Sequence, residues 1–185
     1  MNPNMDPKPE GIMPAGKNKI LILGIGNDIL TDDGIGPRLC DFLRERFSDT
    51  VADFEKLNVG GLEVLEFIDG YETVVIIDAI KTVLGRIGDI YLFTPDHFKE
   101  TLHISNLHDT SFITALKLGR SLEFNIPGRI LIIAVEIKED MVFSESFTSE
   151  LAERYVEVQE NVMQHLEYLV PELSRPPERS PLQVN

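Results

Sequence analysis

The chain has 185 residues, 43% of them hydrophobic, and a formal net charge of −14 at pH 7. This length predicts one domain with a buried core, and the sequence has neither an apolar run long enough to span a bilayer nor a signal peptide. The acidity argues against a nucleic-acid partner, because phosphate contacts require clustered Lys and Arg. We therefore expect a cytoplasmic protein with no membrane partner. The negative charge is compatible with binding a metal, a basic protein or a metal-carrying protein, although most surface charges of this kind only aid solubility.

The first half of the chain alternates predicted strands and helices. Residues 1–18 are expected to be a flexible leader. The aliphatic run 19–23 is typical of a strand buried on both faces, and a helix is predicted over 35–47, with Pro37 in its first turn. A weak strand at 51–57 and a short helix at 62–68 follow. The β-branched run 73–77 is the clearest strand, and Asp78 closes it.

The second half continues this alternation. We predict a strand, suited to a sheet edge, at 88–93, a helix that Asp109 caps and that ends near Arg120, a strand at 129–135 and a long helix from Thr148 or Ser149. Residues 171–185 have the composition of a disordered tail. The predicted fold is α/β, with one domain over 19–170 that contains a mostly parallel, twisted five-stranded sheet and helices on both faces.

The loop after the first strand carries the most unusual chemistry. It contains Gly24-Ile-Gly26, then Asp32 and Asp33, then Gly34-Ile-Gly36. Glycine loops in this position usually receive phosphate, which two carboxylates would repel, and Ile29 replaces the third glycine of a dinucleotide fingerprint. The sequence has no Walker loop and no Gly-x-Ser-x-Gly elbow, and its single cysteine, Cys40, is expected in the core.

Polar residues follow the strands where open α/β sheets bind ligands, beyond the carboxyl ends of the strands. They are Asp32, Asp33, Asp78 and His108. Carboxylates and an imidazole suit zinc, nickel or manganese. Each of these residues could instead have a structural role. Asp32 could bond loop amides or cap the following helix, and Asp33 could be structural or functional. Asp78 could cap a turn, and His108 could bond a backbone carbonyl.

Several motifs together resemble the signature of the nickel–iron hydrogenase maturation endopeptidases. They are Gly24-Ile-Gly-Asn27, Asp32-Asp33-Gly34-Ile-Gly36, Asn58-Val-Gly-Gly61, Val75-Ile-Ile-Asp78-Ala79, Gly88-Asp-Ile-Tyr-Leu92 and His108. The resemblance implies an enzyme that removes the C-terminal extension of a hydrogenase large-subunit precursor after nickel has been inserted. It also implies that Asp33, Asp78 and His108 bind metal, and we assign catalysis to the two aspartates. Family members often carry Glu where this chain has Asp33, so the reach of this ligand differs.

The resemblance leaves two mechanisms open. Either the three ligands bind the nickel that the precursor already holds, which we favour, or a resident zinc or other divalent metal activates water. Gly60 and Gly61 could admit the precursor tail, or could form an ordinary turn. A non-catalytic, metal-dependent chaperone or checkpoint for the precursor is the alternative function, and no role is assigned to Glu136.

Overall fold

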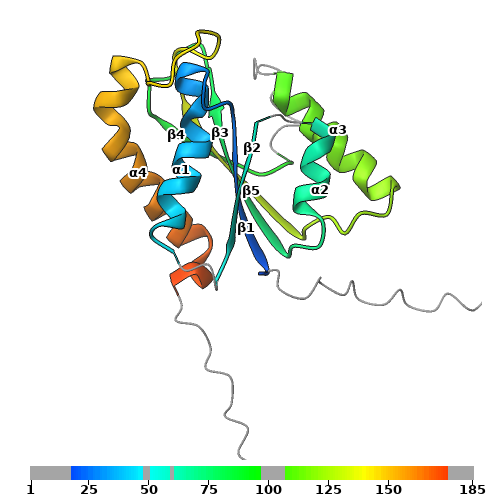
Figure 1. Cartoon of the computed structure of the whole chain (residues 1–185). Coiled ribbons are helices and arrows are strands. Elements are labelled where there is room, and N and C mark those ends of the chain that lie inside the picture. Colours follow the sequence, from blue (N-terminus) through cyan, green and yellow to red (C-terminus); the bar gives the residue numbers. More distant parts are fainter. Residues whose placement is uncertain (1–17, 48–50, 59–60, 97–106, 175–185) are drawn as a thin grey trace, which may run out of the picture.

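A five-stranded sheet forms the centre of the protein (Figure 1). The computed structural model describes residues 18–47, 51–58, 61–96 and 107–174. The strands are β1 (Ile20–Ile25), β2 (Asp53–Leu57), β3 (Thr73–Ile80), β4 (Ile90–Phe93) and β5 (Arg129–Glu136). Their order in the sheet is β2-β1-β3-β5-β4, and only β4 is antiparallel to its neighbour. The predicted mostly parallel α/β sheet, with 88–93 at an edge, is confirmed.

Helices cover both faces of the sheet, with α1 and α4 on one face and α2 and α3 on the other (Figure 1). The helices are α1 (Ile35–Arg44), α2 (Val64–Ile68), α3 (Leu107–Ser121) and α4 (Ser149–Leu169). Short 3-10 turns are η1 (Thr31–Gly34), η2 (Gly61–Glu63) and η4 (Pro171–Ser174). No helix within the described ranges combines the length and the apolar character that crossing a membrane requires.

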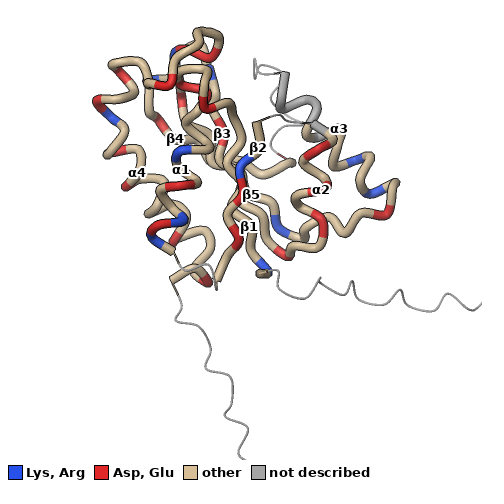
Figure 2. Tube along the Cα trace, in the orientation of Figure 1, with Lys and Arg blue, Asp and Glu red and all other residues tan. Residues whose placement is uncertain are grey.

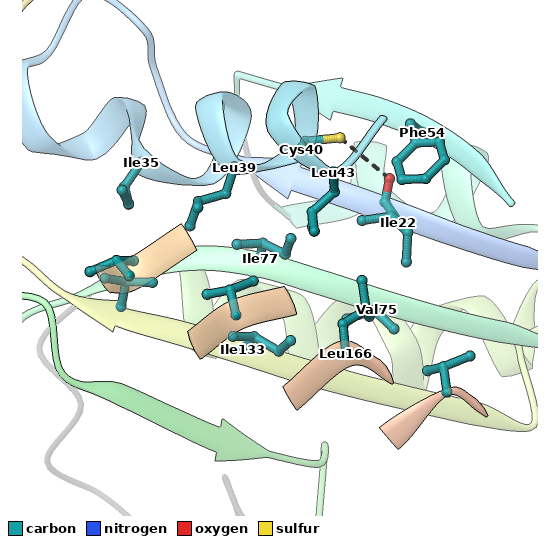
Figure 3. Close-up of a cluster of buried hydrophobic side chains, with 14 of the residues drawn as sticks. Ile22, Ile35, Leu39, Cys40, Leu43, Phe54, Val75, Ile77, Ile133 and Leu166 are labelled. Atoms are coloured by element: carbon teal, nitrogen blue, oxygen red, sulfur yellow. Dashed lines mark hydrogen bonds between the residues drawn. The ribbon is translucent and has the colours of Figure 1, made fainter. Parts of the chain in front are cut away.

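Each face of the sheet has its own apolar core. Ile22, Ile77 and Ile133 pack with residues of α1 and α4, as Figure 3 shows, whereas Leu23 and Ile76 pack with residues of α2 and α3. Successive residues of a strand point to opposite faces, so a strand covered on both faces must be apolar throughout. This requirement explains the continuous aliphatic runs in β1, β3 and β5.

Cys40 is a buried core residue, as predicted (Figure 3). Its Sγ lies 3.2 Å from the backbone oxygen of Glu55. Desolvation by burial raises the pKa of the Cys40 thiol from 9.0 to about 11. The thiol therefore stays protonated at neutral pH and is unsuited to act as a nucleophile or a metal ligand.

Three predicted boundaries are corrected by the structure. β3 continues to Ile80, because β5 supplies hydrogen-bonding partners that far, and Asp78 lies inside the strand, opposite Ala134. α3 begins at Leu107, so Asp109 lies within the helix instead of capping it. The fold also extends past 170, since η4 buries Leu173 in the core, while 175–185 lie outside the described residues.

The predicted leader is described only at its last residue. The side-chain amide of Asn18 donates to Oδ1 of Asp53 at 2.8 Å. This bond ties the segment just before β1 to the start of β2. Residues 1–17 lie outside the described part of the chain.

Candidate functional site

The first turn of α1 rests directly on the carboxyl ends of β1 and β3. A Cβ atom on Gly36 would lie 2.1 Å from the carbonyl oxygen of Ile25 and 2.6 Å from that of Ile77, so no larger residue fits there. Gly36 closely follows Asp33, and Ile77 immediately precedes Asp78. The contact therefore places the start of α1, which closely follows Asp33, beside the β3 residue that precedes Asp78. That the two carboxylates converge stays a prediction.

The half-buried Asp33 closes the turn between β1 and η1. Its Oδ2 atom accepts a hydrogen bond from the backbone N–H of Asn27 at 2.7 Å. Gly26 has a φ of 137°, and a Cβ atom there would lie 2.0 Å from the carbonyl oxygen of Asp33. Only glycine satisfies both conditions, which is why the Gly-x-Gly pattern precedes the aspartates.

Asp78 lies on the face of the sheet that α2 and α3 cover. It alternates along β3 with Val75 and Ile77, which face α1 and α4, and shares its direction with Ile76. The side chain is half-buried, and Oδ1 accepts from the backbone N–H of Ala79 at 2.7 Å. A half-buried carboxylate thus lies near the end of a central strand.

The remaining predicted site residues are only partly described. The backbone of His108 lies in the first turn of α3, which begins at the upper end of the molecule in Figure 1. The imidazole of His108 lies outside the described part of the structure, so its approach to the aspartates stays a prediction. Gly61 begins η2, whereas Gly60 lies outside the described residues.

Asp32, the neighbour of Asp33, has a structural role. Its side chain is completely buried, and Oδ2 accepts from the backbone N–H groups of Lys138 at 3.3 Å and Glu139 at 3.2 Å. The backbone N–H and hydroxyl of Thr148 donate to it at 2.8 and 2.9 Å. Asp32 therefore binds loop amides, one of the two structural roles considered for it, and holds the β5–α4 loop against η1.

Thr31, which directly precedes Asp32, has a strained backbone. Its φ is 44°, which is unusual for a β-branched residue. The backbone N–H of Thr31 donates to the carbonyl of Ser144 at 2.9 Å, and its hydroxyl donates to that of Val142. The β5–α4 loop therefore stabilises a conformation that costs free energy locally, as is common beside functional sites.

Two further acidic residues, to which the sequence alone gave no role, are the buried Glu136 and the partly buried Asp28. Oε1 of Glu136 accepts from the backbone N–H of Thr82 at 2.7 Å, and Oε2 has no hydrogen-bond partner among the described residues. Oδ1 of Asp28 also has no hydrogen-bond partner among the described residues, and Oδ2 of Asp28 lies 3.9 Å from Nζ of Lys56. The sequence feature that could have indicated a role for Glu136 is its position as a charged residue directly after the aliphatic run 129–135.

The chemistry of this edge fits a divalent cation. Carboxylate oxygens are suitable ligands for nickel, zinc or manganese, and a pair of aspartates leaves coordination positions to groups from another molecule. Within the described residues, no cluster of three or more His, Cys, Asp or Glu side chains could hold an ion.

The fold and this edge define a class: single-domain α/β proteins with a carboxylate site at the carboxyl end of a mostly parallel sheet. Comparison with protein families then assigns the chain, because the family model described as "Hydrogenase maturation protease" (HycI) matches residues 53–165. The chain belongs to this family of peptidases. The matched segment contains Asp78 and His108, whereas Asp33 precedes it.

Several solved structures share this fold. The hydrogenase maturating endopeptidase HybD from E. coli has a TM-score of 0.61 and 23% identity, covering 81% of this chain and 93% of that one. An endopeptidase from Escherichia coli has a TM-score of 0.65 and 21% identity over 81% and 93% of the two chains. The [NiFe] hydrogenase maturation protease HybD from Thermococcus kodakarensis has a TM-score of 0.59 and 24% identity over 79% and 97%. At these identities they show the shared fold. A comparison with curated proteins found no match.

Proposed function

We propose that this peptidase removes the C-terminal extension of a nickel–iron hydrogenase large-subunit precursor after nickel has been inserted. The observation that supports the proposal is the contact of Gly36 with the backbone of β1 and β3, since Gly36 closely follows Asp33 and Ile77 immediately precedes Asp78. The family match supports a hydrogenase precursor as the substrate.

The two aspartates would bind the nickel that the precursor already carries. Backbone N–H groups of Asn27 and Ala79 each hold one carboxylate oxygen and thereby orient Asp33 and Asp78. We assign the third ligand to the imidazole of His108, which suits nickel as well as zinc or another divalent metal. Because part of the ligand set would come from the precursor, only a loaded precursor would bind in a productive position.

Hydrolysis would then occur at the same edge. Peptide hydrolysis requires a group that takes a proton from the attacking water, and a carboxylate can act as this base. We assign this task to Asp33 or Asp78, and we place the precursor tail beside Gly60 and Gly61. Metal recognition and catalysis would therefore share one site, so that cleavage follows nickel insertion.

The test compares nickel-loaded and nickel-free precursor incubated with the purified chain. We expect the intact mass of the loaded precursor to fall by the mass of its tail, while the nickel-free precursor keeps its mass. An unchanged mass together with tight, nickel-dependent binding would reject the peptidase activity and support a chaperone or checkpoint instead.

Variants of the proposed ligands test the site itself. We expect Asp33→Asn, Asp78→Asn and His108→Ala each to lower kcat/KM by about 100-fold, a typical effect of removing a metal ligand or base. Glu167→Gln is the matched control, since it neutralises an exposed carboxylate on α4. Circular dichroism verifies that each variant is folded. Wild-type kcat/KM in both aspartate variants would reject the proposed site.

A further inference from the structure

The loops at the site edge expose a group of large apolar side chains. This group, here named the apolar rim, comprises Ile29, Val83, Leu84, Met141, Val142 and Phe143. Ile29 follows β1, the next two follow β3, and the last three follow β5. Val83 is 96% exposed and Phe143 is 77% exposed, whereas apolar side chains of this size are usually at least partly covered.

Direct interactions join these loops into one surface. Nζ of Lys81 lies 2.9 Å from Oδ1 of Asp140, so an ion pair connects the β3–β4 loop to the β5–α4 loop. The backbone N–H of Ser144 donates to the carbonyl of Ile29 at 3.0 Å. The three loops that carry the rim are therefore linked to one another, at the end of the sheet where α1 and α4 begin (Figure 1).

Buried polar groups hold the rim loops in place. Among the described residues, the buried polar side chains are Thr31, Asp32 and Glu136, and each of them bonds one of these loops. The carboxyl group of Glu136 also fills the space beside Gly85, where a Cβ atom would lie 2.2 Å from its Cδ and Oε2. Burying carboxylates is costly unless they are bonded, so their use here indicates loops that are held in a defined conformation.

A preorganised apolar surface suits a protein ligand. Loops that are already ordered lose little conformational entropy on binding, and burial of the rim would remove apolar area from water. The net charge of −14 disfavours an acidic partner, and Figure 2 shows acidic residues on elements at both sides of the sheet. The rim also continues the edge that carries Asp33 and Asp78, so its occupant would lie beside the candidate site.

We propose that the apolar rim docks an apolar segment of the precursor polypeptide next to the bond that is cleaved. This inference rests on the proposed function, since it assigns part of the same substrate to a second surface. Met141 and Phe143 on one loop, and Val83 and Leu84 on another, contact apolar side chains of that segment. The aspartates select for nickel, and the rim supplies affinity for the chain around it.

The experiment measures binding and cleavage of nickel-loaded precursor by two rim variants, Met141→Ser/Phe143→Ser and Val83→Ser/Leu84→Ser. We expect each to raise the Kd and the KM at least tenfold while kcat at saturating precursor stays within twofold. The control, Leu122→Ser/Tyr168→Ser, removes exposed apolar side chains that lie outside the rim, directly after the C-terminus of α3 and in the last turn of α4. Its Kd and KM should stay within twofold of wild type.

The outcomes separate this inference from the proposed function. If wild type cleaves the loaded precursor and both rim variants keep its Kd and KM, the docking surface is rejected while the peptidase function stands. If wild type binds without cleaving and the rim variants weaken binding, the function is rejected and the docking surface stands. A wild-type dimer in sedimentation experiments that both rim variants dissociate would assign the rim to a second copy of the chain and overturn the proposal.

Discussion

Asp32 accepts two hydrogen bonds from Thr148, one from its backbone N–H at 2.8 Å and one from its hydroxyl at 2.9 Å. The two residues are 116 positions apart, and Thr148 is the N-cap of α4. The contact therefore fixes the start of the last long helix against the loop that also carries Asp33. Asp32 thus holds these loops together, whereas its neighbour Asp33 bonds only within its own loop in the interactions described above and is the one that we propose for the candidate site.

The adjacent aspartates should respond differently to the same substitution. We expect Asp32→Asn to lower the free energy of unfolding by about 2–4 kcal/mol, because an amide replaces a buried carboxylate that accepts several bonds. Asp33→Asn should cost about 1 kcal/mol or less, since the half-buried side chain retains an oxygen that can accept from Asn27. Urea denaturation followed by circular dichroism measures both values. Equal losses would contradict the division of roles.

Gly36 is predicted to tolerate no side chain. Gly36→Ala would place a Cβ atom 2.1 Å from the carbonyl oxygen of Ile25, and backbone atoms cannot move aside without displacing α1 from the sheet. We expect a loss of about 3 kcal/mol or more in unfolding free energy, or no folded protein. Gly128→Ala is the matched control, because its Cβ atom would meet nothing within 4 Å, and it should change stability by less than about 1 kcal/mol. A stable Gly36→Ala variant with wild-type melting would show that the close contact is absent.

Glu136 is expected to order the β3–β4 loop through its bond to Thr82. Glu136→Ala leaves the backbone N–H of Thr82 without its acceptor and should cost about 1–3 kcal/mol in unfolding free energy. Hydrogen exchange of the Thr82 amide should become faster, because the loop opens more readily. Glu136→Gln keeps an oxygen acceptor and should retain most of the protection, so equal exchange rates in the two variants would argue against this bond as the anchor.

The Cys40 thiol makes stability depend on alkaline pH. Burial raises the pKa of this thiol from 9.0 to about 11, so the folded state keeps its proton after the unfolded state has lost it. Between these values the unfolded chain binds fewer protons, and the free energy of unfolding falls as the pH rises, by up to about 3 kcal/mol. Urea denaturation from pH 8 to pH 11 measures this slope, to which Tyr71 and Tyr155, whose pKa values are also raised, contribute in the same direction.

Cys40→Ala is the control for this pH dependence. The variant should lose the contribution of Cys40, and its stability should fall less steeply above pH 9 than that of wild type. A thiol reagent should modify folded wild type slowly at pH 8, since the sulfur is buried and protonated. Identical slopes in the two proteins, or rapid modification of the folded chain, would contradict the raised pKa.

The sequence by itself determined the fold class and the identity of the central strands. The runs 19–23 and 73–77 are apolar at every position because both faces of these parallel strands are covered, and this pattern needs no knowledge of distant contacts. The prediction that Asp33 and Asp78 share one site has the same origin, since parallel strands present their carboxyl ends together. The glycines at positions 26 and 36 could be read as a loop motif, whereas the backbone contacts that exclude a side chain there became visible only in the structure.

Only the tertiary structure decided which acidic residues have structural roles. Asp32 and Asp33 are neighbours of the same type, and they differ because the N–H groups that bond Asp32 come from residues 106 to 116 positions away. Glu136 is distinguished in the same way by Thr82, which a different loop supplies. Burial and hydrogen bonding of a carboxylate depend on which distant backbone groups surround it, and that information is created only when the chain has folded.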